Sequence, residues 1–433
     1  MPSSKTIVIC CDGTGQTIRA AQPVKPHRVV RTNVLRTFDL LKKDGATQVS
    51  CYDPGIGTIP GLEGELDLIR KLKNVRDEWL GTGLMSNLAA MYVYLMEHYE
   101  PGDRIFLFGF SRGAFTVRAL AGIIRSVGLL RKGHEHLLPW VRDVYENMAA
   151  RHRRAGRRDE EANDELAREF RGFTRPDDIR IAFLGVWDTV KAYGYLTPKG
   201  LPHVRNNELV DVVRHAVAID ERRSPFQPTG WSDRVLRQNP AIDEERINHR
   251  IKEVWFAGDH SDVGGGHADN RTDFFSKASF DWILGEAAHE GLRLSPDRYD
   301  EVTGWTPGLP PSPDCVPHDL SRVGPGRFMW IPPRLELDNS HFPPSREFKC
   351  LAHTGDRCLL DHTFPDTVWR KARRSAGEAT GPDKPFLCLH ESVRERYRRG
   401  NYTPENLRVA FAAEQKGEIT IQWIKSRDPQ RLR

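Results

Sequence analysis

The chain of 433 residues has no apolar run long enough to cross a membrane, and its first residues lack the apolar core of a secretory signal peptide. Its seven cysteines are an odd number without any Cys-x-x-Cys spacing, and Cys10 and Cys11 are adjacent in a strand-like run. These absences argue against a disulfide framework and against a zinc site. We therefore expect reduced thiols and a cytoplasmic protein, with secretion that needs no signal peptide left open.

The net charge is also small. The formal net charge is only +5 across 64 basic and 59 acidic residues, which is mild for this length. Such a balance does not argue for nucleic acid as a partner. The hydrophobic fraction of 39% supports a substantial core, as in ordinary globular proteins.

Apolar runs of strand length alternate with segments of helical period along the first 290 residues. The expected strands are 6–11, 48–52, 105–108, 179–187 and 253–258. The expected helices are 32–40, 81–98, 112–126 and 274–289, and the apolar pattern of 211–219 fits either structure. This alternation predicts an α/β fold with a doubly wound, mostly parallel sheet.

Composition divides the chain into two expected parts. Residues 1–292 form the α/β core, and within them residues 131–176 form an inserted basic helical arm that includes the stretch RHRRAGRR. A solvated helical face is the favoured interpretation of the arm, and peripheral membrane contact is the alternative. Residues 293–433 are rich in proline and glycine and predict an irregular C-terminal cap with a last helix near 391–398.

The motif Gly109-Phe-Ser-Arg-Gly113 joins an expected strand to an expected helix. A serine in this context is typical of a nucleophile elbow, a strained turn whose glycines allow strand and helix to pack closely. The backbone N–H of Arg112, at the start of the helix, would then face an oxyanion formed beside Ser111. The alternative is that Ser111 only caps the helix.

Three further polar residues, Asp12, Asp188 and His260, follow expected strands. Because ligands bind at the carboxyl ends of strands in open α/β sheets, these side chains are expected to meet Ser111 there. The order Ser111, Asp188, His260 is that of an α/β-hydrolase triad of nucleophile, acid and base.

The loop after the first strand would supply the second oxyanion donor, from Gly13 or Thr14. Two assignments have alternatives. Asp188 could be a turn or cap residue, and His267 and His390 compete with His260 for the role of base.

Other chemistries are weaker on the sequence. Asp259, Asp262 and Asp269 have oxygens that suit a divalent cation, but their spacing is not that of an EF-hand, and solvated carboxylates are favoured. The Gly264-Gly-Gly266 run lacks the lysine of a phosphate-binding P-loop. We therefore expect neither a metal nor a cofactor.

Two other functions stay open. One is a metal-dependent phosphoesterase that uses Asp12, Asp188, Asp259 and His260. The other is a non-catalytic binding or assembly module whose working surface is the basic arm.

Four stretches together resemble a known family. They are Cys11-Asp-Gly-Thr14 with Thr32-Asn-Val34, Gly109 to Phe115, Gly185 to Val190, and Trp255 to Gly266. The family is an α/β-hydrolase family long described as a domain of unknown function, whose members include class-one phospholipase effectors of type VI secretion. Residues 53–58 and 215–222 also look like family stretches, and the resemblance covers residues 5 to 290.

The resemblance implies a serine esterase or phospholipase with an ester or lipid substrate and no cofactor. It places the serine, aspartate and histidine of the family on Ser111, Asp188 and His260. Aromatic residues of the C-terminal third could line an acyl pocket, although packing in the core or cap is the favoured interpretation. These residues are Trp305, Phe328, Trp330 and Phe342.

Overall fold

The computed structural model describes the sheet, most of its helices and the loops at the carboxyl ends of the strands. The described residues are 4–13, 31–54, 83–155, 173–174, 179–190, 201–221, 228–231, 250–267, 273–303, 386–400, 402–417 and 420–427.

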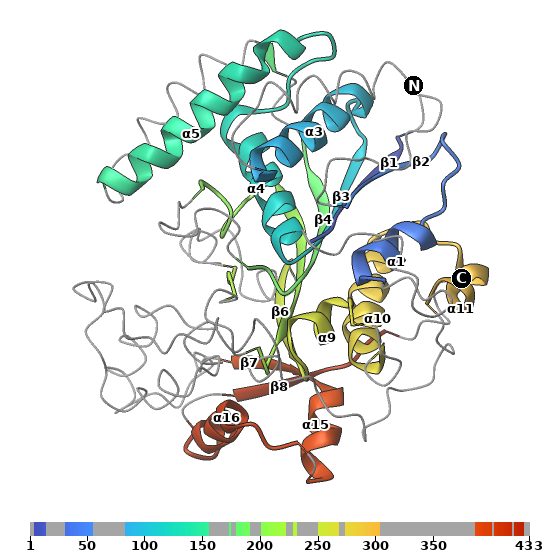
Figure 1. Cartoon of the computed structure of the whole chain (residues 1–433), viewed down its shortest axis with the longest axis vertical. Helices are drawn as coiled ribbons and strands as arrows, with labels where there is room; N and C mark the ends of the chain where they lie inside the picture. Colours follow the sequence, from blue (N-terminus) through green and yellow to red (C-terminus); the bar gives the residue numbers. More distant parts are fainter. Residues whose placement is uncertain are drawn as a thin grey trace, which may run out of the picture.

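Eight strands of the described residues form one sheet in the order β2-β1-β3-β4-β5-β6-β7-β8, and all of these neighbouring strands pair in parallel (Figure 1). Their bounds are Thr6–Cys11 (β1), Gln48–Asp53 (β2), Arg104–Phe110 (β3), Ile181–Trp187 (β4), Val210–Ala218 (β5), Ile251–Phe256 (β6), Phe386–His390 (β7) and Thr420–Ile424 (β8). The predicted α/β fold with a parallel sheet is confirmed, and the ambiguous segment 211–219 belongs to a strand.

The central strands are apolar throughout because helices cover both faces of the sheet. Every residue of β1 is buried, with Ile7 and Ile9 in the hydrophobic cluster of one face and Val8 and Cys10 in that of the other. Side chains alternate between the two faces of a strand, so a continuous apolar run is what a doubly covered strand requires.

Helices of the described residues lie on both sides of the sheet (Figure 1). One face carries α3 (Gly83–His98), α4 (Arg112–Val127) and α5 (Leu138–Ala155), and the other carries α1 (Asn33–Leu40), α10 (Asp273–His289) and α11 (Tyr299–Thr303). A short helix, α9 (His260–Gly264), follows β6, while α15 (Glu391–Arg398) and α16 (Glu405–Gln415) accompany the last two strands.

The sheet continues beyond residue 292. The helix expected near 391–398 is present as α15, but it is not the last, because α16 follows it. The residues before α15 form β7, and β8 pairs with β7 along five residues. The expected irregular cap is therefore wrong for these residues, whose strands are short and far in sequence from their neighbours. Their pairing depends on contacts such as Trp255 with Leu389 that no local pattern indicates.

Within the basic arm, α5 packs on the core by one side only. Leu138, Val141 and Tyr145 are buried in the same hydrophobic cluster as α4, whereas the Trp140 side chain is 65% exposed. Arg157 and Arg158 of the arm lie outside the described residues, as do the four aromatic residues suggested for an acyl pocket. None of the described helices is long and apolar enough to span a membrane.

The chain order of the strands reverses between β1 and β3. From β1 the chain passes to β2 on one side, and β3 lies on the other side of β1. Loops that leave two adjacent strands in opposite directions create a crevice at the carboxyl edge, which is where α/β proteins bind ligands. The last residues of β1 and β3, Cys11 and Phe110, lie at this edge.

The approach of α4 to β1 is too close for a side chain at residue 113, and this gives a stability prediction. A Cβ on Gly113 would lie 2.6 Å from the carbonyl oxygen of Asp12 and closer still to that of Cys11. Both obstacles are backbone, so we expect Gly113→Ala to lower the free energy of unfolding by about 3 kcal/mol or more, measured by urea denaturation. Gly45→Ala is the control, because Gly45 has φ +70° with nothing near its Cβ position, and it should cost only about 1–2 kcal/mol. Equal losses in the two variants would contradict the collision.

Candidate active site

Ser111 occupies a strained turn between β3 and α4. Its backbone has φ 57° and ψ −122°, a region that residues other than glycine rarely adopt. Ser111 holds the N-cap position of α4, but its side chain makes no capping hydrogen bond. The turn is possible because Gly109 has no Cβ, which would lie 2.6 Å from the Cα of Ala114. The hydroxyl is therefore directed away from the helix that follows it.

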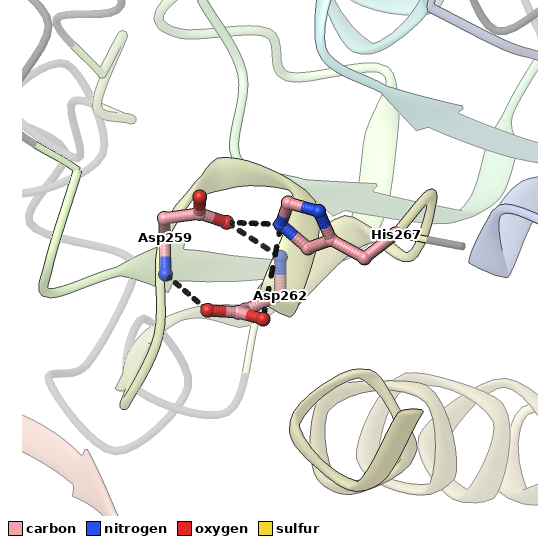
Figure 2. A group of neighbouring side chains, drawn as sticks. All are labelled: Asp259, Asp262 and His267. Atoms are coloured by element: carbon pink, nitrogen blue, oxygen red, sulfur yellow. Dashed lines mark hydrogen bonds and ion pairs between the residues drawn. The ribbon is translucent and has the colours of Figure 1, made fainter. Parts of the chain in front are cut away.

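The loop after β6 is fixed by a capping box at the start of α9. The Asp259 carboxylate accepts hydrogen bonds from the backbone amides of Ser261 and Asp262, and the Asp262 carboxylate accepts one from the Asp259 amide. His267 approaches the same Asp259 oxygen at 3.0 Å (Figure 2). His260 is the first residue of this helix, so the capping box fixes the backbone from which the His260 side chain extends.

Asp259, Asp262 and His267 also form the only group among the described residues in which three metal-ligating atoms lie within 4.8 Å of one another. The four residues of the phosphoesterase alternative are not brought together as such a group in the described part of the chain. Asp269, the third carboxylate considered from the sequence, lies outside the described residues. In this structure the two carboxylates serve as helix caps.

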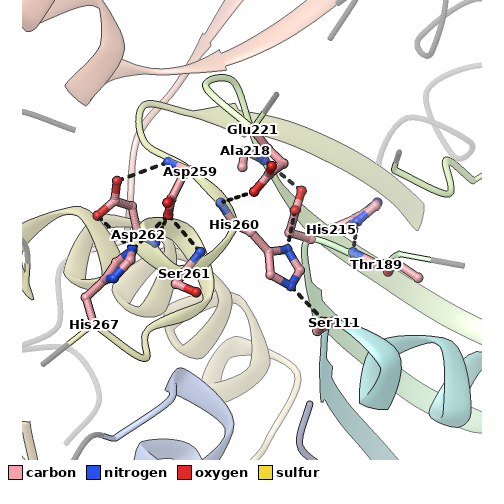
Figure 3. Close-up of polar contacts among 11 residues, drawn as sticks. Ser111, Thr189, His215, Ala218, Glu221, Asp259, His260, Ser261, Asp262 and His267 are labelled. Atoms are coloured by element: carbon pink, nitrogen blue, oxygen red, sulfur yellow. Dashed lines mark hydrogen bonds and ion pairs between the residues drawn. The ribbon is translucent and has the colours of Figure 1, made fainter. Parts of the chain in front are cut away.

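The His260 ring joins Ser111 to Asp188. Its Nε2 forms a hydrogen bond with Ser111 Oγ (Figure 3), over 2.7 Å, and its Nδ1 lies 2.6 Å from Asp188 Oδ2. The three side chains come from the carboxyl ends of β3, β6 and β4, and all are buried, with Ser111 8% exposed and Asp188 fully enclosed. The Phe110 ring packs against the imidazole at a centroid distance of 4.6 Å. The structure thus connects a hydroxyl, an imidazole and a carboxylate in one chain of hydrogen bonds.

Backbone groups of β5 hold the Asp188 carboxylate and main chain. Asp188 Oδ1 accepts a hydrogen bond of 2.9 Å from the amide of Ala218, and the Asp188 amide donates to the Ala216 carbonyl. Glu221 helps to hold the backbone of His260, because its carboxylate accepts a hydrogen bond from the His260 amide at 3.3 Å. Glu221 carries no sequence signal for this contact, because the contact depends on the position of the loop after β5.

The first strand ends beside Ser111. A Cβ on Gly13 would lie 3.1 Å from the Ser111 Cβ, so the glycine permits a close approach. The Gly13 amide donates a hydrogen bond of 2.8 Å to the carboxylate of its neighbour Asp12. Thr14, the other expected oxyanion donor of this loop, lies outside the described residues. Arg112 begins α4 directly after Ser111, as expected.

Asp12 is a buried junction between three segments. Besides the Gly13 amide, its carboxylate accepts hydrogen bonds from the hydroxyls of Thr32 and Tyr52. Burial raises the pKa of Asp12 to about 6, and the hydrogen bonds from Thr32, Tyr52 and Gly13 oppose that rise. Thr32 also caps α1. The carboxylate therefore ties the N-terminus of α1 and the end of β2 to the loop that faces Ser111.

The two rival histidines face other partners. His267 contacts Asp259, as described above. His390 lies at the N-cap of α15, with its Nε2 3.1 Å from Ser426 Oγ and its ring stacked on Phe256. Burial lowers the pKa of His390 to about 3, so it is neutral at physiological pH.

Residues 5–286 match the family model described as the Tle1-like phospholipase effector of type VI secretion systems, catalytic domain. A Saccharomyces cerevisiae protein, the uncharacterized protein YEL023C, is 36% identical over 237 residues, which are 52% of this chain and 32% of the yeast protein. The chain therefore matches about a third of the length of this relative.

Two solved structures are similar at lower sequence identity. An uncharacterized protein from Pseudomonas aeruginosa has a TM-score of 0.41 and 17% identity, covering 99% of this chain and 65% of that one. A Tle1 effector bound to the VgrG spike has a TM-score of 0.29 and 19% identity, covering 61% and 51%. Both TM-scores are too low to support an argument about this chain.

The raised pKa of Asp12 predicts a pH-dependent stability. Its ordinary value is 3.8 and its folded value about 6, so between these pH values the folded state binds more protons than the unfolded state. Stability should then fall as pH rises from 4 to 7, by up to about 3 kcal/mol relative to Asp12→Asn, which does not titrate. Urea denaturation of both proteins at each pH measures this difference.

Asp44→Asn is the matched control. The Asp44 carboxylate is exposed and accepts hydrogen bonds from Thr47 and Gln48, which lower its pKa, so its effect should be constant over the same pH range. A constant difference for Asp12→Asn as well would show that the buried carboxyl does not titrate there.

Proposed function

Because this chain belongs to the family of Tle1-like phospholipase effector catalytic domains of type VI secretion systems, we propose that it is a serine hydrolase that cleaves carboxylic esters. Ser111 is the nucleophile, His260 the general acid and base, and Asp188 the acid that orients His260. The observation that carries the proposal is the continuous hydrogen-bonded chain from Ser111 Oγ through His260 to Asp188, with distances of 2.7 and 2.6 Å.

The tautomer of His260 follows from its partners. The Asp188 carboxylate can only accept a hydrogen bond, so the ring proton of His260 stays on Nδ1 and is donated to Asp188. The lone pair of Nε2 then faces the Ser111 hydroxyl. His260 then removes the hydroxyl proton as Ser111 attacks the ester carbonyl, and the buried Asp188 stabilises the imidazolium. This arrangement allows a weak nucleophile to react at neutral pH.

The remaining steps use the same groups. The backbone N–H of Arg112, at the positive end of α4, stabilises the oxyanion. Collapse of the tetrahedral intermediate breaks the bond to the alcohol, which leaves with the proton held by His260 and gives an acyl-Ser111. His260 next activates a water molecule, and its attack releases the carboxylic acid and restores Ser111.

We propose lipid acyl esters as the substrate class, on the strength of the family alone. The basic arm, residues 131–176, is proposed as a site of peripheral membrane contact, which the exposed Trp140 of α5 supports. Residues 1–292 carry all three residues of this proposed mechanism, and the residues of the expected cap add β7 and β8 to the same sheet.

The decisive test is a panel of short- and long-chain esters and phospholipids with wild type, Ser111→Ala and His260→Ala. Each substitution should lower kcat by about 10³-fold or more, because the three groups act as one unit. His390→Asn is the matched control, since asparagine keeps the cap of α15 and His390 lies outside the site; it should retain activity. Equal hydrolysis by wild type and Ser111→Ala would rule out the mechanism.

Two further measurements separate the alternatives. A fluorophosphonate probe should label wild type at Ser111, and a chelator should leave hydrolysis unchanged. Loss of hydrolysis with a chelator, together with full activity of Ser111→Ala, would favour the metal-dependent phosphoesterase. Absence of any hydrolysis, with no labelling, would favour the binding module.

A further inference from the structure

A second histidine–carboxylate pair lies directly beside the first. His215 of β5 and Glu253 of β6 are Cα partners in the parallel register, and the His215 Nδ1 lies 2.6 Å from Glu253 Oε1. His215 is only 1% exposed. Neither residue belongs to the mechanism proposed above, although the stretch 215–222 is one that the sequence analysis singles out.

The tautomer of His215 is determined by a backbone amide. The N–H of Thr189 donates a hydrogen bond to His215 Nε2 (Figure 3), and the distance is 3.1 Å. A backbone N–H group can only donate, so His215 Nε2 must be the acceptor. The ring proton of His215 therefore lies on Nδ1, facing Glu253. Glu253 Oε1 also accepts a hydrogen bond from the amide of Trp231 at 2.8 Å, which fixes the carboxylate in turn.

Thr189 is the residue that follows Asp188, and both of its backbone polar groups are held. Its carbonyl accepts a hydrogen bond of 2.8 Å from the amide of Thr229, opposite the bond to His215. Asp188 itself has φ 39°, a strained value for an aspartate. Such a conformation persists only where surrounding contacts impose it, at a cost of about 1–3 kcal/mol.

The buried guanidinium of Arg118 contacts the segment that holds the Thr189 carbonyl. Arg118 of α4 donates to the carbonyls of Val204, Thr229 and Gly230, and its guanidinium lies over the Trp231 ring at 5.0 Å. Burial lowers its pKa to about 9, and the charge of Glu253 opposes this change. Arg118 thus holds the segment that fixes Thr189 from its other side, and it adds a positive charge near Glu253.

From this geometry we propose that His215 is a positioning residue: with Glu253 it holds the amide of Thr189 and thereby keeps Asp188 in the strained conformation that orients His260. The inference rests on the proposed function. His215 touches neither substrate nor Ser111, and its contribution passes entirely through the backbone at residues 188 and 189.

The test compares three substitutions at residue 215. In His215→Gln the side-chain oxygen reaches the place of Nε2 and accepts from Thr189, whereas in His215→Asn it stops one atom short and in His215→Phe it is absent. We expect His215→Asn and His215→Phe to lower kcat for a soluble ester by about 10–100-fold with KM nearly unchanged, because His260 is then misoriented. His215→Gln should keep kcat within about 5-fold of wild type. Thermal melting confirms that each variant is folded.

The coupling to Asp188 is measured in a double-mutant cycle. In an Asp188→Ala background, where there is no carboxylate left to position, His215→Asn should cause no further loss of kcat. A full additional loss would overturn the proposal, and so would a folded His215→Gln variant whose kcat is as low as that of His215→Asn. If His215→Asn and His215→Phe do not fold, the kcat of His215→Gln is the test, and a value more than about 5-fold below wild type would overturn the proposal. Equal activity of wild type and Ser111→Ala would instead refute the proposed function.

Discussion

The geometry of the candidate site depends on the groups that hold the fully buried carboxylate of Asp188. A buried charge is costly unless hydrogen-bonded partners surround it. Here the carboxylate accepts from the amide of Ala218 and contacts the ring of His260. The parallel sheet makes this possible because β4, β5 and β6 end at the same edge, where a side chain after one strand meets the backbone of the next.

Close packing at the same edge places Ser111 opposite that carboxylate. The strained turn at Ser111 requires α4 to lie almost in contact with β1 and β3, and the glycines at residues 109 and 113 allow it. Strain at both Ser111 and Asp188 is concentrated at the crevice, while the core below consists of ordinary apolar strands. Such a division is typical of functional sites supported by a rigid sheet.

Acidic residues at the crevice perform different tasks according to their neighbours. Asp259 and Asp262 cap the helix that begins with His260, and Asp12 joins α1 and β2 to the loop after β1. Asp188 instead forms a hydrogen bond with the imidazole that contacts Ser111. The local sequence places Asp12, Asp188 and Asp259 in the same kind of position, after a strand. Asp188 is distinguished in the sequence only by the chain order of a triad and by the family resemblance.

The parallel α/β fold, most of the strands and helices, and the turn at Ser111 can be predicted from the sequence, because these features depend on apolar runs and on glycines a few residues apart. Only the tertiary structure decided which histidine faces Ser111. His260, His267 and His390 all follow apolar or glycine-rich segments, and the contact that distinguishes them joins residues 149 positions apart. The same holds for His215 with Thr189 and for β7 and β8, whose partners are set by register and ring orientation between distant strands.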